Sequence, residues 1–433
     1  MDTDHARLIE SVSTDMSAKE IIERCRPSLE KYENIYQDLH RHPDLSLQEA
    51  RTASIVKKHL EDLNFDVHSK IGGEGVVGIL QNGTGKKVLL RADMDALPIL
   101  ESTGLDYAST KTTRNAEGKE VPVMHACGHD MHTTALLATA MLLNTARPLW
   151  RGTLICLFQP NEETACGAQA MVDDGLYTRH QVPIPDIVLG QHIQTLKAGM
   201  VALRAGPILA AVDSFDIRIF GKGGHGARPD LCIDPIVTTG HIITRLLTVV
   251  SREVQPGELA VISCGSIHGG AAANIIPDYV DLKLTARAYS PQVQQKLLEG
   301  IERVVRLECQ TSGATQDPTI KTIMHAPATI NDLAPYEVLN QAFQAHFDGN
   351  LCKGEPKGAS EDFSNLATAC GAPYLFWNFG CVGAEEWAEA ENEGRTAYIP
   401  GPHTARFRPA IQPTLETAVD SFSLAALTFL GVR

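Results

Sequence analysis

The sequence lacks any run of 18 or more apolar residues, so no membrane-spanning segment is predicted. It also lacks a block of lysine and arginine with interleaved aromatic residues. Its 38 basic and 52 acidic residues give a net charge of −14, so we expect no nucleic-acid partner. The first twenty residues contain neither a basic nor an apolar segment, and no secretory signal is predicted. Ten cysteines in 433 residues are too few for a disulfide framework, and we therefore expect a cytoplasmic protein with reduced thiols.

The length of the chain fits two domains, and the first part of the sequence has an α/β pattern. Residues 17–63 show helical spacing that is interrupted at Pro43. Beyond them, apolar runs alternate with helical segments, and these runs lie at 75–80, 86–92, 152–159 and 186–190. Continuous apolar strands that alternate with helices are typical of a mostly parallel, doubly wound sheet.

From about residue 210 the pattern changes. The segments 214–221 and 278–289 alternate polar and apolar residues, as half-buried strands do. The other elements of this part are helices expected at 235–254 and 291–310 and strands expected at 259–265 and 319–325. Their order is β-α-β-β-α-β. We therefore predict a ferredoxin-like α+β domain over residues 210–325, inserted into a larger domain that residues 1–209 and 326–433 form.

Polar side chains cluster directly after predicted strands of the larger domain and in one late loop. The donors in these clusters are Asp93, Asp95, Cys127, His129, Glu162, Glu163, His192 and His403. Ligands of an open parallel sheet bind outside the carboxyl ends of its strands, so we expect these side chains to form one site. Imidazole, thiolate and carboxylate together suit Zn, Mn, Co or Ni. Eight donors exceed the need of one tetrahedral ion, which favours two divalent ions that share a bridging water. In the Glu162–Glu163 pair, one carboxylate can ligate while the other takes a proton from that water.

Other interpretations of these residues remain open from the sequence alone. A lone histidine in a loop is usually a structural residue, and a pair of glutamates is usually a solvated surface. Cys127 could be a nucleophile with His129 or His125 as its base, which would make the protein a thiol hydrolase. His225 could be incidental to its glycine-rich turn. A non-catalytic binding protein on the same fold is a further alternative.

Seven blocks along the chain resemble those of the M20 metallopeptidases. In order they are "LHRHPDLSLQE", "LRADMDALPI", "HACGHDMHTTALL", "FQPNEE", "GKGGHGARPD", "AANIIPD" and "ASEDFS". They are most similar to the amidohydrolase branch, which includes auxin-conjugate hydrolases, hippurate hydrolases and N-acyl-amino-acid amidohydrolases. The resemblance extends from about Leu39 to about Pro409.

The resemblance implies a role for each residue of the site. The family's metal ligands correspond to Cys127, His129, Glu163, His192 and His403, and its general base corresponds to Glu162. In the wider superfamily a His-x-Asp motif provides a ligand and an orienting aspartate. Asp93 and Asp95 occupy those two positions, so Asp95 is expected to orient and Asp93 is not counted as a ligand.

The inserted domain resembles the family's lid or dimerisation domain. His225 corresponds to a histidine that stabilises the oxyanion, often from the partner subunit, and Asn274 and Arg287 match positions that contact substrate. The resemblance thus implies a homodimer that hydrolyses the amide bond of small N-acyl amino acids or amino-acid conjugates, with a dipeptidase or carboxypeptidase as the alternative. Two departures from the branch are Asn161, where alanine is usual, and the late block "PHTARFRP".

Overall fold

The computed structural model describes residues 16–432, which separate into two compact units. Unit 1 comprises the chain up to Gly206, Asn331–Glu355 and the chain from Asn365 onward. Unit 2 comprises Pro207–Ile330 together with Pro356–Ser364. Residues 326–433 were predicted to belong to the larger domain, whereas Pro356–Ser364 lie in unit 2. Within the described residues, no helix has the length and apolarity that a membrane crossing needs.

Unit 1 is built on an eight-stranded mixed sheet. In spatial order its strands are β1 (Asp66–Ile71), β2 (Gly75–Asn82), β6 (Gly152–Gln159), β3 (Lys87–Asp93), β7 (Ile187–Lys197), β18 (Tyr374–Val382), β8 (Val201–Leu203) and β17 (Leu351–Lys353). The four central strands β6, β3, β7 and β18 are mutually parallel. Outside this centre, β1 pairs antiparallel with β2, β2 with β6 and β8 with β18, whereas the edge strand β17 pairs parallel with β8. The predicted α/β fold with a mostly parallel sheet is confirmed, and the antiparallel pairs are an addition to it.

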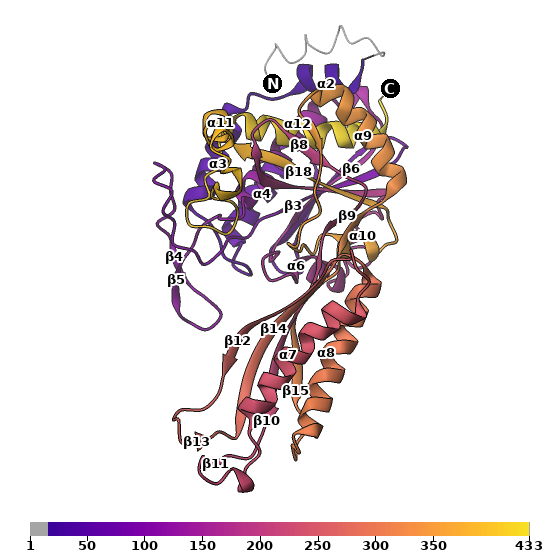
Figure 1. The fold of residues 1–433 in the computed structure, drawn as a ribbon. Coiled ribbons are helices and arrows are strands. Elements are labelled where there is room, and N and C mark those ends of the chain that lie inside the picture. Colours follow the sequence, from indigo (N-terminus) through magenta and orange to yellow (C-terminus); the bar gives the residue numbers. More distant parts are fainter. Residues whose placement is uncertain (1–15, 433) are drawn as a thin grey trace. The chain divides into compact units, whose positions relative to one another are not determined.

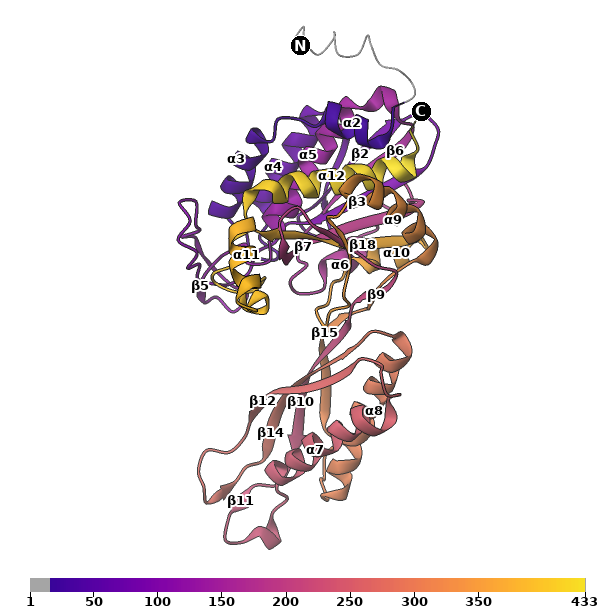
Figure 2. The same cartoon turned by 45° about the horizontal axis from the view of Figure 1, so that its top comes forward.

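Helices cover both faces of this sheet, as the prediction of a doubly wound fold requires. The helices of unit 1 include α2 (Ala18–Cys25), α3 (Glu30–Arg41), α4 (Ala50–Asp62), α5 (His129–Thr145), α6 (Gly167–Asp173), α9 (Leu333–Phe347), α11 (Ala384–Asn392) and α12 (Ile411–Leu430). Figures 1 and 2 show α12 on one side of the sheet and α6 on the other, and Figure 2 shows α5 on the same side as α12.

Helix α5 is buried on nearly its whole circumference, and it packs between α12 and β3. Val88, Leu90 and Ala92 point from alternate positions of β3 into the core that contains α5. Complete burial of an aliphatic side chain is worth about 1.5–3 kcal/mol. The start of α5, where His129 lies, is therefore held firmly against the sheet.

Unit 2 has one four-stranded antiparallel sheet in the order β12 (Ala260–His268), β14 (Tyr279–Ala288), β10 (Ala211–Phe220) and β15 (Thr319–Ala326). Helices α7 (Pro235–Glu253) and α8 (Pro291–Thr311) pack on this sheet around a common apolar core. Both helices begin at a proline, and the side chains of Asp234 and Ser290 cap them. The order along the chain is β-α-β-β-α-β, which confirms the predicted ferredoxin-like fold. A short ladder of β11 (Gly224–His225) and β13 (Ile275–Ile276) extends from the sheet.

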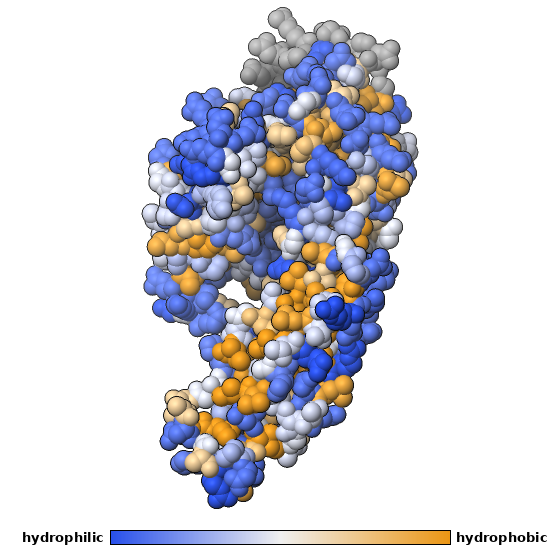
Figure 3. Space-filling model, viewed as in Figure 1, coloured by the Kyte–Doolittle hydropathy of each residue, from blue (hydrophilic) through white to orange (hydrophobic). Residues whose placement is uncertain are grey.

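Apolar side chains also lie on the surface of unit 2. Figure 3 shows orange residues among the blue ones on its visible face. Exposed apolar residues of this unit include Val237, Leu247, Ile267 and Ile275. Single exposed apolar residues are normal on a globular surface.

Candidate metal centre

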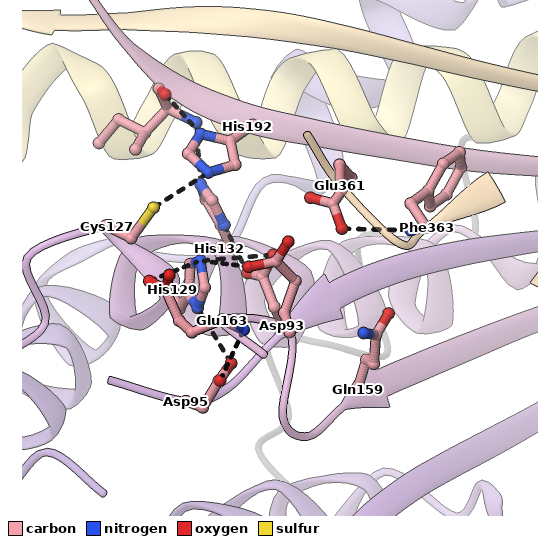
Figure 4. A network of polar contacts seen from close by, with 12 residues as sticks. Asp93, Asp95, Cys127, His129, His132, Gln159, Glu163, His192, Glu361 and Phe363 are labelled. Atoms are coloured by element: carbon pink, nitrogen blue, oxygen red, sulfur yellow. Dashed lines mark hydrogen bonds and ion pairs between the residues drawn. The ribbon is translucent and has the colours of Figure 1, made fainter. Parts of the chain in front are cut away.

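The side chains that the sequence analysis grouped together come from neighbouring elements of unit 1. Asp93 ends β3, Asp95 follows two residues later, and the Glu162–Glu163 pair follows the end of β6. His192 lies within β7. Because β6, β3 and β7 are adjacent and parallel, their carboxyl ends meet at one edge of the sheet. Figure 4 shows His192, Cys127, His129 and Glu163 gathered around this edge.

Cys127 and His129 are presented by the turn that starts α5. Gly128 between them has a φ of 83° and precedes the helix as its N-cap. A Cβ atom at this position would lie 2.6 Å from Cγ2 of Ile193, so both the backbone angle and the space require glycine. This glycine lets the thiol and the imidazole lie side by side.

His403 reaches the same place from a loop that precedes α12. Its backbone N–H donates to the carbonyl of Ala126 at 2.7 Å, which ties the loop to the residue before Cys127. Its φ of 66° is left-handed, an angle that histidine adopts more readily than most residues. Long-range backbone pairing thus brings together two donors that are far apart in sequence.

The distances define two overlapping sets of donors. Sγ of Cys127 lies 3.4 Å from Nε2 of His192 and 3.2 Å from Nε2 of His403. Oε2 of Glu163 lies 3.4 Å from Nε2 of His403, whereas its Oε1 lies 4.0 Å from Nε2 of His129. The carboxylate of Glu163 therefore has one oxygen toward each set.

Three groups of donor atoms that consist only of predicted site residues each lie within 4.8 Å of one another, as a metal ion requires. They are Cys127–His129–His192, Cys127–Glu163–His403 and His129–Glu162–Glu163. Each of Cys127, His129 and Glu163 belongs to two groups. Shared donors of this kind suit two adjacent ions better than one.

Two buried atoms test whether a cation fits this cluster. Nε2 of His129 and Oε1 of Glu163 have no hydrogen-bond partner among the described residues. Leaving a buried polar atom unpaired costs about 1–3 kcal/mol. A divalent ion between them would satisfy both atoms, and the thiolate, imidazole and carboxylate donors are those that borderline divalent metals prefer. The side chains of this cluster therefore fit a divalent metal ion.

Hydrogen bonds set the tautomers of two of these histidines. Nδ1 of His192 donates to the carbonyl of Ile193 at 2.6 Å, which leaves the lone pair of Nε2 directed toward Cys127. Nδ1 of His129 donates to Oδ1 of Asp95 at 3.2 Å, which leaves the lone pair of its Nε2 for the cluster. An imidazole whose other nitrogen donates to an oxygen is the usual form of a histidine ligand.

His132 and Asp93 are also close, but their polar atoms are already engaged. Nε2 of His132 accepts the N–H of Ile193 at 2.8 Å, and Nδ1 donates to Oδ1 of Asp93 at 2.6 Å. Oδ2 of Asp93 accepts from Nη1 of Arg91 at 2.6 Å. These contacts engage both carboxylate oxygens of Asp93 and both ring nitrogens of His132. They make His132 a support for β7 rather than a donor to a cation.

Asp95 connects several parts of the cluster. Besides the bond to His129, its Oδ2 accepts from Oγ of Ser46 at 2.7 Å and from the backbone N–H of Glu163 at 3.0 Å. One buried carboxylate thereby orients an imidazole of α5 and fixes the loop after β6.

The pKa values in the cluster are shifted because three carboxylates lie close to the imidazole of His129. Burial raises the pKa of Glu163 to about 8, against the influence of His129 and with the help of Asp95 and Asp93. Burial disfavours the charged form of His129, but the same carboxylates outweigh it and raise its pKa to about 10. Burial lowers the pKa of His192 well below its usual value, which keeps that imidazole neutral. A bound dication would displace the protons on His129 and Glu163, because ligands must be deprotonated.

Three predicted site residues lie in unit 2. His225 is exposed in β11, where its Nδ1 accepts the N–H of Ala227 at 3.0 Å. Asn274 is close to it, because the carbonyl of Asn274 accepts the N–H of Gly226 at 2.8 Å. Arg287 lies at the other end of the sheet, opposite Val212, and its Nη1 donates to the carbonyl of Gly358 at 2.6 Å. The structure thus brings His225 and Asn274 together and places Arg287 apart from them.

Sequence reasoning missed the role of Glu49. This buried carboxylate accepts the N–H of Asn161 at 2.8 Å and that of Leu47 at 2.9 Å, so it fixes the residue that precedes Glu162. Asn161 itself has a left-handed φ of 57°. An acidic residue at the start of the amphipathic helix α4 was the only signal, and it does not reveal a partner 112 residues away.

A second missed group surrounds the start of α5. His40 is buried between Asp130 and Glu101, with Nδ1 2.7 Å from Oδ2 of Asp130 and Nε2 3.1 Å from Oε1 of Glu101. The carboxylate of Asp130 also accepts the backbone N–H of Met131 at 2.9 Å. His125 is buried, and neither of its ring nitrogens has a partner among the described residues.

Comparisons with known proteins agree with this geometry. A model of peptidase family M20/M25/M40 matches residues 89–395. The hippurate hydrolase of Campylobacter jejuni is 36% identical over 352 residues, which cover 80% of this chain and 87% of that protein. An N-acetyl-L-cysteine deacetylase of Bacillus subtilis is 35% identical over 82% of this chain and 81% of its own length.

A solved structure is similar over nearly the whole chain. The crystal structure of a dinuclear metal-binding peptidase of the M20 family from Bacillus subtilis matches with a TM-score of 0.72 and 29% identity. The match covers 92% of this chain and 98% of the other. The chain belongs to peptidase family M20/M25/M40.

Proposed function

We propose that this protein hydrolyses the amide bond of N-acyl amino acids or amino-acid conjugates, with two divalent ions of Mn, Zn, Co or Ni at the cluster. The observation that carries the proposal is the overlap of the donor groups, with the unpartnered atoms of His129 and Glu163 beside Glu162. Two relatives are named as a hippurate hydrolase and an N-acetyl-L-cysteine deacetylase, and these names support the substrate class.

The ligands in this proposal are Cys127, His129, Glu163, His192 and His403. The ions, when bound, would polarise the scissile carbonyl and lower the pKa of a water molecule. Asp93 stays outside the ligand set because its oxygens are engaged by Arg91 and His132.

Glu162 is the proposed general base. Its Oε2 lies 3.8 Å from Nε2 of His129, and the side chain is nearly buried. It takes a proton from the attacking water at its carboxylate and returns that proton to the nitrogen of the leaving amine. Asp95 holds the imidazole of His129 and the backbone of Glu163 in place for this step.

Unit 2 has the role of lid and dimerisation domain in this proposal, and residues 210–325 form most of it. His225 donates a hydrogen bond to the developing oxyanion, from the same chain or from the partner subunit of a homodimer. The exposure of His225 and its closeness to Asn274 support this role. Loss of one such donor typically costs about 2.7–4 kcal/mol of transition-state stabilisation. Asn274 and Arg287 contact substrate, and the protein works in the cytoplasm.

The adjacent glutamates provide a matched pair of variants. Glu162→Gln should lower kcat by a factor of about 10²–10⁴, the usual contribution of a general base, while two ions remain bound. Glu163→Gln should instead lower the metal content, which inductively coupled plasma mass spectrometry measures on the dialysed protein. Full activity of Glu162→Gln would refute the assignment of the base.

The substrate class is tested with N-acetyl, N-benzoyl and indole-acetyl amino acids and with dipeptides, each with added Mn. Hydrolysis of dipeptides alone would favour the dipeptidase or carboxypeptidase alternative. Mixing Glu162→Gln chains with His225→Ala chains tests whether His225 acts across a dimer, because recovered activity requires one intact site from two chains.

A thiol hydrolase is the second candidate, and the contacts of Cys127 with two imidazoles favour it. His192 or His403, rather than His129 or His125, would then be the base, since these are the rings next to the sulfur. Chelation with EDTA separates the two functions. Loss of activity with recovery on adding Mn, Zn or Co supports the metal enzyme, and sensitivity to iodoacetamide alone supports the thiol enzyme.

A further inference from the structure

We infer that a cavity beside His403 binds a carboxylate of the substrate through Arg406. This inference rests on the proposed function and names a part of the substrate that the metal cluster does not select. The cavity has a volume of about 580 Å³, and the residues that line it include Ser102, Thr195, Thr396, Tyr398, Thr404 and Arg406.

Residues that line the cavity lie close in sequence to two candidate ligands. Thr404 and Arg406 follow His403 in the same loop, and Thr195 follows His192 in β7. The loop packs directly on this strand, because a Cβ atom at Gly401 would lie 2.6 Å from Oγ1 of Thr195. In this inference, a substrate whose amide bond lies at the cluster extends into the cavity.

The position of Arg406 in the loop is fixed on both sides. The N–H of Ser102 donates to the carbonyl of Ala405 at 2.8 Å, and the backbone of His403 is held by Ala126. The next residue, Phe407, is 1% exposed and belongs to the main apolar core of unit 1. The guanidinium thus projects from an anchored backbone.

Four side chains that line the cavity are not used as donors within the described part of the protein. Across residues 16–432, the side chains of Arg406, Thr195, Thr396 and Tyr398 form no hydrogen bond or ion pair. All four can donate to an anion, and hydrogen bonds from a guanidinium to a carboxylate are among the strongest in proteins.

Neighbouring arginines behave differently. Nη2 of Arg408 lies 3.8 Å from a carboxylate oxygen of Glu386, and Nε of Arg395 donates to Glu393 at 2.7 Å. Arg406 has no carboxylate partner among the described residues, so its guanidinium is available to a ligand. Arg406 therefore has the features of a residue whose partner is a ligand.

The size of the cavity agrees with a small organic acid. Ligand pockets usually have volumes of about 300–1,000 Å³, and this one lies within that range. The carboxylate could belong to the amino acid that is released or to a dicarboxylic acyl group. Both sources present the same chemistry to Arg406, so the experiment must separate them.

Three compounds on one scaffold make this separation. N-acetyl-alanine carries its carboxylate on the amino acid, N-succinyl-alaninamide carries it on the acyl group, and N-acetyl-alaninamide carries none. Their dissociation constants are measured by calorimetry on the metal-loaded Glu162→Gln chain, which should not consume them. The same measurements are made with Arg406→Gln added, and with Arg408→Gln added as the matched control.

We expect Arg406→Gln to weaken binding of one carboxylate-bearing compound about tenfold or more and to leave N-acetyl-alaninamide unchanged. The compound that loses affinity identifies the source of the carboxylate, and Arg408→Gln should change none of the three constants. Equal affinities in Arg406→Gln and its parent, or no binding of any compound, would overturn the inference. If the compounds bind through Arg406 but the wild-type protein hydrolyses no N-acyl amino acid, the proposed function fails while the carboxylate site stands.

Discussion

Replacing His40 with glutamine should destabilise the protein most at acidic pH and progressively less as the pH rises. The imidazole is buried between the carboxylates of Asp130 and Glu101 at 2.7 and 3.1 Å. Burial disfavours its charged form, but the hydrogen bonds and charges of the two carboxylates outweigh burial and raise the pKa of His40 to about 9. Folding therefore favours the protonated imidazole.

The size and the sign of the effect follow from proton linkage. The pKa of His40 in the folded state, about 9, lies above the value of about 6.5 in the unfolded chain. Its contribution is fully present below pH 6.5 and is lost as the pH rises through 9. Each tenfold change in proton affinity is worth about 1.4 kcal/mol. The difference between the two pKa values of His40 therefore contributes about 3 kcal/mol to the free energy of unfolding.

The assay is thermal unfolding of metal-free wild-type and His40→Gln protein between pH 6 and pH 9, followed by circular dichroism. The gap in Tm should be several degrees at pH 6 and should narrow steadily toward pH 9. His59→Gln is the control, because burial lowers the pKa of His59 to about 4 and its protonation affects stability only below pH 6.5. A His40→Gln gap that is constant over this range would refute the reasoning.

Three further substitutions test the supports of the site. Gly128→Ala should destabilise the protein by about 2 kcal/mol and lower its metal content, because the methyl group meets Ile193 and the φ of 83° is strained. The Tm measures the loss of stability, and mass spectrometry measures the metal content. Asn161→Ala should cost about 1 kcal/mol through its left-handed φ, seen as a lower Tm with two ions retained. Glu49→Ala should lower kcat more than it changes KM, because the loop of Glu162 loses a buried hydrogen-bond acceptor. Steady-state kinetics measure both constants, and an unchanged kcat would contradict the role of Glu49 as a support of this loop.

Much of the fold follows from local patterns in the sequence. Continuous apolar strands predict the parallel centre of the sheet, and alternating strands predict unit 2 as a ferredoxin-like domain. Periodicity does not encode pairings between distant segments. Such pairings determine the antiparallel strands outside the parallel centre and the membership of Pro356–Ser364 in unit 2. The position of a loop relative to a sheet is decided by such pairings.

The same distinction applies to the candidate site. Clusters at the ends of β3, β6 and β7 were predicted to meet because parallel strands place them at one edge. His403 comes from a loop, so the order of the strands does not place it in the site, and its backbone bond to Ala126 explains how it arrives. The supports provided by Glu49 and His40 are side-chain contacts across large separations, and no spacing rule predicts them.

The carboxylate of Asp95 also decides where one proton resides. As long as Asp95 accepts, the hydrogen of the His129 ring stays on Nδ1 and the lone pair of Nε2 faces the cluster. An asparagine of the same shape could turn its amide N–H toward Nδ1 and move that hydrogen to the opposite side of the ring. Its carbonyl could still accept the N–H of Glu163, so the fold would be kept while the imidazole lost its capacity to ligate. With the proposed set of ligands, affinity for metal at this edge of the sheet thus depends on whether residue 95 presents an oxygen or a nitrogen atom to His129.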